Sequence, residues 1–153
     1  MQAILRDLTA LEFDILERHL DLAYAICKKY VPSFKGEFTA QLLTQVFALW
    51  LEDTSTGIAD NAIENFNSSS QEKPNTKMIE FALGSAYGDV LNTAFDTQWK
   101  HIADEYGEEL CIRHENPEYT TFPYSIVQKR ISSQETVFFE PIMATMSYAI
   151  SKK

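Results

Sequence analysis

One segment of the chain limits the fold more than any other, because it is nearly uncharged and holds two glycines one helical turn apart. Between Glu80 and Asp96 there is a single charged residue, and Gly84 and Gly88 lie four positions apart. A glycine in a helix interior costs about 1 kcal/mol relative to alanine, so a sequence that keeps two gains a close contact there. We expect a helix over residues 76–95 whose glycines admit another helix or a sheet, or form a groove for a ligand.

Two further helices are expected before this segment. Residues 9–31 begin with Thr9 and Glu12, which have the spacing of a capping box. The apolar residues of this helix cover more than half of its circumference, so it packs on two sides, within the domain or against a second copy of the chain. They are Leu11, Ile15, Leu16, Leu20, Leu22, Ile26 and Cys27. A second helix is expected over residues 38–52, with one or two more turns over 58–66.

The second half of the chain changes its periodicity. The serine-rich residues 67–75 predict a mobile loop between a helical part (about 1–66) and an α+β part (76–153) of a single domain. We therefore expect an α-rich α+β fold with an N-terminal helical layer, a small antiparallel sheet and a C-terminal helix that covers it. The expected elements are strands at 97–102, 110–114 and 119–122, a short helix capped by Ser125 that runs to Ile131, an extended piece at 137–139, and a closing helix that starts with Pro141.

Charge and composition exclude several classes of function. The 153 residues include 13 Lys and Arg against 22 Asp and Glu, which gives a net charge of −9. Such a chain is repelled by nucleic-acid backbones and anionic membranes, so we expect neither as a partner. The first residues do not resemble a secretory signal and no apolar run has the length of a membrane helix, so a cytoplasmic location is expected. Cys27 and Cys111 are expected to be reduced.

Common catalytic and cofactor motifs are missing from the sequence. There is no phosphate-binding loop, no dinucleotide-binding glycine pattern, no H-E-x-x-H and no C-x-x-C, so no cofactor and no catalytic residue is assigned. His19 shares the apolar side of the first helix and is expected to be a core or interface histidine. His101 and His114 have acidic neighbours, which leaves a divalent metal site as one reading.

The densest charge lies between Asp104 and Glu118. This stretch holds six acids against one base, Arg113, with Tyr106 among the acids and Tyr119 directly after the last of them. One interpretation of this acidic stretch is a solvated rim that maintains solubility. The other is an acidic and aromatic patch that docks a basic protein. The residues assigned to that patch are Asp104, Glu105, Tyr106, Glu108, Glu109, Glu115, Glu118 and Tyr119.

A resemblance to a family covers about residues 78–150. It rests on Leu83, Gly84, Gly88 and Leu91 of one helix, on Trp99, and on the segment Phe122-Pro123-Tyr124-Ser125-Ile126-Val127-Gln128-Lys129-Arg130-Ile131. In these features the chain resembles a family of uncharacterised small bacterial domains. The resemblance implies a small α+β module without assigned catalytic residues, in which Trp99, Phe122 and Pro123 anchor strands against the glycine-bearing helix.

Three functions follow from these observations. The first is a non-enzymatic protein-binding module, immunity- or antitoxin-like, that uses the acidic hairpin, or a secretion-chaperone-like homodimer that uses the first helix. The alternative is a small-molecule binding module whose groove is lined by Gly84, Tyr87, Gly88, Phe95 and Trp99. The third is a metal-dependent hydrolase that uses His101 and His114.

Overall fold

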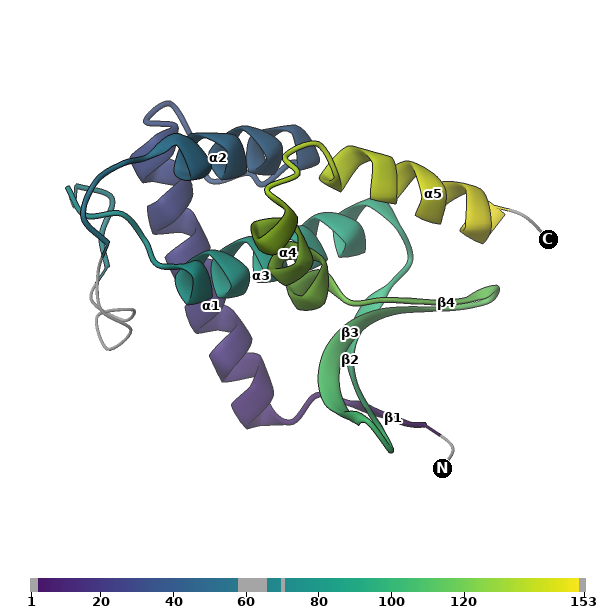
Figure 1. The fold of residues 1–153 in the computed structure, drawn as a ribbon. Coiled ribbons are helices and arrows are strands. Elements are labelled where there is room, and N and C mark those ends of the chain that lie inside the picture. The colour runs from purple at the N-terminus through teal and green to yellow at the C-terminus, as the bar shows by residue number, and fades with distance from the viewer. Residues whose placement is uncertain (1–2, 58–65, 70, 152–153) are drawn as a thin grey trace.

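A computed structural model describes residues 3–57, 66–69 and 71–151. Within these ranges the chain has five helices and one four-stranded antiparallel sheet, which makes it an α+β fold with a C-terminal helix (Figure 1). The elements are β1 (Ile4–Asp7), α1 (Ala10–Tyr30), α2 (Ala40–Glu52), α3 (Thr76–Ala94), β2 (Gln98–Asp104), β3 (Gly107–Glu115), β4 (Glu118–Thr121), α4 (Pro123–Ser133) and α5 (Phe139–Ser151). None of the helices in the described ranges combines the length and the apolar character that a membrane crossing requires.

The first helix begins at the predicted capping box. The backbone N–H of Glu12 donates to the Thr9 hydroxyl at 3.1 Å, and the Glu12 carboxylate accepts from the Thr9 N–H at 2.9 Å. These two bonds satisfy backbone donors that have no partner inside the helix. The helix ends at Tyr30, one residue before the predicted Val31. The expected helix over residues 9–31 is thereby confirmed.

The second helix is shorter than predicted and contacts the segment that precedes α3. It begins at Ala40, with Thr39 as its N-cap, rather than at residue 38. The indole N–H of Trp50 donates to the carbonyl of Pro74 at 2.7 Å, which ties α2 to the chain just before α3. The described residues between 66 and 75 belong to no helix or strand, as expected of a loop. The helical turns expected over 58–66 fall almost entirely outside the described residues.

Two aromatic side chains of this chain lie against the two glycines of α3. A Cβ atom added to Gly88 would lie 2.0 Å from Cζ2 of Trp99, and one added to Gly84 would lie 2.6 Å from Cδ1 of Tyr124. Trp99 belongs to β2 and Tyr124 to α4, so the glycines allow both the sheet and α4 to approach the α3 backbone closely. We call these two contacts the glycine seam.

The sheet runs in the order β1-β2-β3-β4, with every neighbouring pair antiparallel. Trp99 lies opposite Ile112, and both side chains belong to the hydrophobic core. Lys100 lies opposite Cys111 on the other face, because side chains alternate along a strand. The first strand was not expected, because its four residues are mostly exposed and show no buried alternation.

Two expected helix starts are wrong. Helix α4 begins at Pro123, and the Ser125 hydroxyl donates to the Glu109 carboxylate of β3 instead of capping a helix. Helix α5 begins at Phe139, two residues before Pro141, so residue 139 is helical rather than extended. Pro141 fits in the first turn because the first N–H groups of a helix have no intrahelical partner. This last helix packs against α2 and β4.

The glycine seam predicts the effect of a single methyl group. Gly88→Ala is expected to reduce the free energy of unfolding by about 1–3 kcal/mol, because the added Cβ overlaps the Trp99 ring. An unconstrained helical glycine would show the opposite sign, a gain of about 1 kcal/mol. Urea unfolding followed by circular dichroism measures the difference. Trp99→Phe should cost less free energy of unfolding in the Gly88→Ala protein than in the wild type, because the smaller ring relieves the overlap. A Gly88→Ala protein that is more stable than the wild type would contradict the seam.

Candidate functional site

The structure divides the predicted acidic patch into two groups at opposite ends of β3. The turn that joins β2 to β3 precedes Gly107, and the turn that joins β3 to β4 follows Glu115. Eight residue steps of strand separate these ends, which corresponds to ~26 Å. Asp104, Glu105, Tyr106 and Glu108 lie at the first end, and Glu115 and Glu118 lie at the second.

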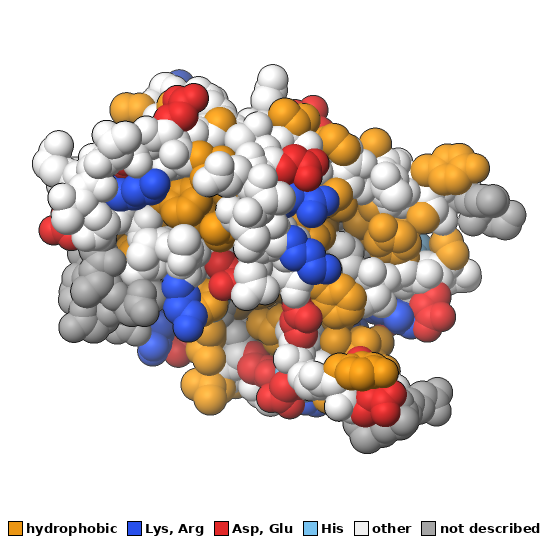
Figure 2. Space-filling model, in the orientation of Figure 1, with side chains coloured by type: hydrophobic (Ala, Val, Ile, Leu, Met, Phe, Trp, Pro, Cys, Tyr) orange, Lys and Arg blue, Asp and Glu red, His pale blue; other side chains and the backbone are white. Residues whose placement is uncertain are grey.

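We call the first group, Asp104, Glu105, Tyr106 and Glu108, the acidic tip. Tyr106 is 89% exposed, which is the highest value among the exposed large hydrophobic residues that the structure describes. The Asp104 carboxylate accepts a hydrogen bond from the Tyr106 backbone N–H at 2.8 Å, and Gly107 has a φ of +136°, which favours glycine. The turn therefore presents one aromatic ring between carboxylates. Acidic and apolar side chains lie together at this lower end of the molecule (Figure 2).

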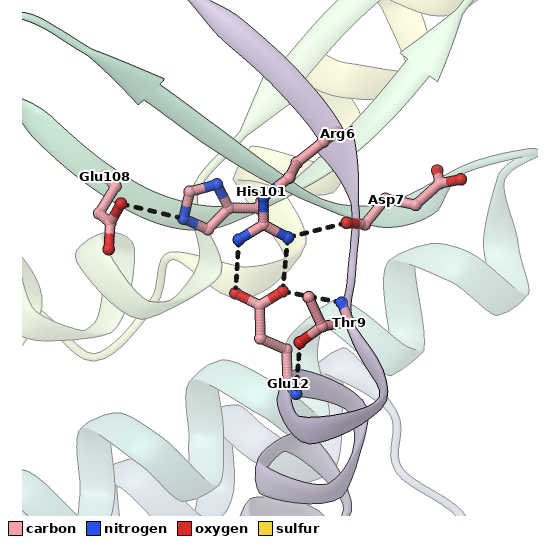
Figure 3. Close-up of polar contacts among 6 residues, drawn as sticks. All are labelled: Arg6, Asp7, Thr9, Glu12, His101 and Glu108. Carbon is pink, nitrogen blue, oxygen red and sulfur yellow. Dashed lines mark hydrogen bonds and ion pairs between the residues drawn. The ribbon is translucent and has the colours of Figure 1, made fainter.

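A polar network connects the strands behind the tip to the first helix (Figure 3). The Arg6 guanidinium donates two hydrogen bonds to the Glu12 carboxylate, at 2.7 and 3.1 Å. The hydrogen bond and charge of Arg6, with the Thr9 cap, lower the pKa of Glu12 to about 2. Arg6 lies opposite His101 in the sheet, and Nε2 of His101 is 3.5 Å from the Glu108 carboxylate. These contacts hold β1, the hairpin and the start of α1 together.

The other acids of the predicted patch have partners within this chain. Glu109 accepts the hydrogen bond of Ser125, at the place where α4 meets β3. Glu115 and Glu118 both pair with Arg113, which also donates to the Thr120 hydroxyl at 2.8 Å. Tyr119 is partly buried against the hydrophobic core. These four predicted site residues do not share a surface with the tip.

The predicted ligand groove is filled by the protein itself. Trp99 occupies the space beside Gly88, and Tyr124 occupies the space beside Gly84. Tyr87 is fully buried and its hydroxyl donates to the carbonyl of Phe139 at 2.8 Å. Phe95 packs against the same core. A ligand at this position would have to displace side chains that hold the fold together.

The two histidines of the metal hypothesis do not converge. His101 lies opposite Leu110, and His114 is four residues further along β3, which corresponds to ~13 Å. Nδ1 of His114 lies 2.7 Å from the carbonyl oxygen of Pro117. Across the described ranges, no group of three or more His, Cys, Asp or Glu side chains is arranged to hold a metal ion. The geometry gives the hydrolase hypothesis no support.

A polar cluster that the sequence did not predict lies where α1, α3 and α4 meet. Nδ1 of His19 is 2.9 Å from the Tyr124 hydroxyl, and the imidazole stacks on Phe81 with ring centroids 4.5 Å apart. Burial lowers the pKa of His19 to about 4, so the imidazole is neutral at pH 7. Burial and the charge of Glu109 raise the pKa of Glu80, although Lys77 opposes them. The tertiary contact between Tyr124 and Gly84 creates this cluster, and no spacing in the sequence indicates it.

Both cysteines are buried and free. Burial raises the pKa of Cys27 to about 12. It also raises the pKa of Cys111 to about 11, although Arg113 and Lys100 oppose that shift. Neither thiol has the depressed pKa of a reactive cysteine.

Comparison with known proteins places the second half of this chain in a family. The family model described as "Domain of unknown function (DUF3806)" matches residues 60–142, just over half of the chain. The expectation of an uncharacterised domain family is confirmed, although the match begins earlier than the resemblance did. No curated protein matches the chain, and no solved structure matches it.

The Arg6–Glu12 pair gives a prediction with a defined pH window. A folded-state pKa of about 2, below the ordinary 4.5, means that the pair stabilises the protein above pH 4.5 and that this stability is lost as the pH falls towards 2. Glu12→Gln keeps a capping acceptor but removes the charge. We expect it to cost ~0.2–1 kcal/mol at pH 7, as exposed ion pairs do, and progressively less as the pH falls from 4.5 through 2. Urea unfolding across this range measures the effect; a cost that does not change with pH would contradict the assignment.

Proposed function

The chain belongs to the DUF3806 family, a domain of unknown function, and we propose that this member is a protein-binding module that docks a basic partner on its acidic tip. The observation that carries the proposal is Tyr106, which is almost fully exposed between the carboxylates of Asp104, Glu105 and Glu108. Tyrosine is enriched at protein interfaces, where its ring supplies contact area and its hydroxyl a hydrogen bond. The tip lies inside the region that the family model matches.

The anchoring of the hairpin supports this role. Asp104 fixes the turn, and the Arg6–Glu12 pair fixes β1, which pairs with the hairpin along β2. A surface that is already ordered before binding loses less conformational entropy when it binds. Ile4, which lies opposite Ala103, is also exposed and adds an apolar side chain at the same end of the sheet.

The charge of the chain supports a basic partner. The net charge of −9 attracts a positively charged protein over a distance, and the tip concentrates three carboxylates at its end. Such complementarity increases the association rate and selects against acidic partners. A neutralising protein of the immunity or antitoxin type, which must capture a basic target quickly, is the specific role that we propose. Its partner has a lysine- and arginine-rich surface with a recess for one tyrosine ring.

Charge removal at the tip tests the proposal. The test protein carries Asp104→Asn, Glu105→Gln and Glu108→Gln, and the asparagine keeps the acceptor that shapes the turn. The control protein loses the same charge at exposed acids elsewhere, through Glu37→Gln, Glu52→Gln and Glu140→Gln. Each tagged protein captures partners at low salt from a lysate of the source organism, and mass spectrometry identifies them. The captured protein is then purified and titrated by calorimetry.

We expect one basic protein to bind the wild type and the control in a 1:1 complex, and to bind the tip variant about tenfold or more weakly. Its binding should also weaken as salt is added, because salt screens exposed charges. Equal binding to all three proteins would move the contact away from the tip. A wild-type protein that retains no basic partner would contradict the docking function itself.

The first helix supports a second contact, with another copy of the chain. Leu11 and Ile15 lie four residues apart on one side of α1 and are both exposed, and Phe13 is exposed on another side of the same helix. Leu16 and Leu22 are buried, so the described residues cover only part of the apolar surface of this helix. Phe13 lies between two open hollows of about 500 Å³, one along α1 and one beside Trp99. Exposed apolar patches of this kind are typical of interaction surfaces.

Sedimentation equilibrium tests this second contact. We expect the mass of the wild type to rise towards that of a dimer with concentration, and the double variant Leu11→Gln, Ile15→Gln to stay monomeric with unchanged circular dichroism. The control variant is Glu17→Gln, which changes an exposed residue of α1. Leu20 is half-buried, so a change there would also affect the packing of the helix. A monomeric wild type at all concentrations would exclude the homodimer.

A further inference from the structure

The core-distant face of the sheet carries a polar hollow that the docking function does not use. It has a volume of about 250 Å³ and lies between the start of β2, the end of β3 and the turns beside them. The residues that line it are Asp96, Gln98, Lys100, Arg113, His114, Glu115 and Asn116. Lys100 and Arg113 project from the same face, because Arg113 lies opposite Gln98 and Lys100 lies two residues further along β2. The hollow is therefore built around two cations on rigid strands.

The two cations are largely withdrawn from water, whereas the acids that pair with them are not. The side chains of Lys100 and Arg113 are 18% and 14% exposed. Their partners Asp7 and Glu118 are 82% and 71% exposed. An exposed carboxylate gains little free energy from its ion pair, because water screens the attraction and the side chain loses entropy when it pairs. An anionic group that enters the hollow competes with these partners on favourable terms.

Two polar groups of the hollow are incompletely paired within the described part of the chain. Nε of Arg113 is buried and has no hydrogen-bond partner; the nearest Glu115 oxygen is 3.6 Å away. For Asp96, an exposed acid, no hydrogen bond or ion pair appears within the described part of the chain. The hollow thus combines an incompletely satisfied cation with a carboxylate that has not been neutralised. A buried donor without a partner costs free energy that a correctly placed acceptor recovers.

From this arrangement we propose that the hollow binds a small zwitterion of amino-acid size. Its carboxylate lies against Lys100 and Arg113, and its ammonium group faces Asp96. The amide side chains of Gln98 and Asn116 supply further hydrogen bonds to the same ligand.

The size and charge of the hollow limit the class of ligand. Pockets for drug-sized molecules and cofactors span ~300–1,000 Å³, so a hollow of about 250 Å³ excludes nucleotides and larger cofactors. A simple anion would satisfy the two cations but would place its charge near Asp96 and Glu115. A zwitterion meets both signs of charge, and this selectivity distinguishes it from a plain carboxylate or phosphate. Ligand binding here is independent of the acidic tip, which lies at the other end of β3.

The experiment screens the purified protein against a panel of L-amino acids by thermal denaturation, then titrates the best of them by calorimetry. Succinate and inorganic phosphate lack the ammonium group, and ethanolamine lacks the carboxylate, so these probes separate the two halves of the site. We expect at least one amino acid to raise Tm and to bind in a saturable 1:1 manner, and to bind more tightly than any of the three partial probes. Lys100→Gln and Asp96→Asn should each weaken it by about tenfold, the loss expected for one charge-assisted contact.

Matched variants keep this test decisive. Lys129→Gln removes an equal charge from the exposed side of α4 and should bind as the wild type does. Removing the charge of Arg113 would also break its contacts with Thr120 and Glu118 of β4. Arg113→Lys keeps the charge, so it should weaken the carboxylate contact without unfolding the protein. Binding that is unchanged in both Lys100→Gln and Asp96→Asn would overturn the site. Binding of succinate or phosphate in preference to every amino acid would overturn the zwitterion, and an absence of saturable binding by any probe would overturn the proposal.

Discussion

The close contact between Gly88 of α3 and Trp99 of β2 is the interaction on which the rest of the structure depends. Because Gly88 has no side chain, the indole ring of Trp99 can lie against the helix backbone, and the ring of Tyr124 lies against Gly84 in the same way. The sheet and α4 are thereby fixed to one helix whose interior residues are nearly all buried. Because Trp99 also sets the position of β2, the seam determines where the hairpin points. Chemistry at the surface follows from packing in the core.

The geometry of the sheet determines where the charged side chains lie on the surface. Alternation along β2 and β3 places the core residues Trp99 and Ile112 on one face and the cations Lys100 and Arg113 on the other. The length of β3 then separates the acidic tip from the second turn. A single hairpin thus carries both the acidic, aromatic end that we propose docks a basic protein and the mixed-charge hollow that we propose binds a small ligand. The two proposals use different faces and fail independently.

The sequence predicted the helices well and the surface less well, for physical reasons. Capping at Thr9, periodic apolar residues and the paired glycines are local signals, and they gave the three long helices to within a few residues. Strand β1 has no such signal, since pairing with β2 forms it and leaves it exposed. Ser125 fits a helix cap by spacing, yet Pro123 starts the helix earlier and frees the hydroxyl for Glu109. The sequence analysis assigned the acids to one patch, because a count of charges does not contain the distance that a strand puts between them.

Amide hydrogen exchange measured by NMR tests the central claim most directly, that the seam joins α3 and the sheet into one cooperative unit. We expect the amides of β2 and β3 around Trp99 and Ile112 to be protected to the same degree as those around Gly88 in α3, because all of them open only with global unfolding. Exchange from β2 and β3 that is orders of magnitude faster than from α3 would contradict the account. It would mean that the sheet opens while the helices stay folded, and that the hairpin is not held in place by the core.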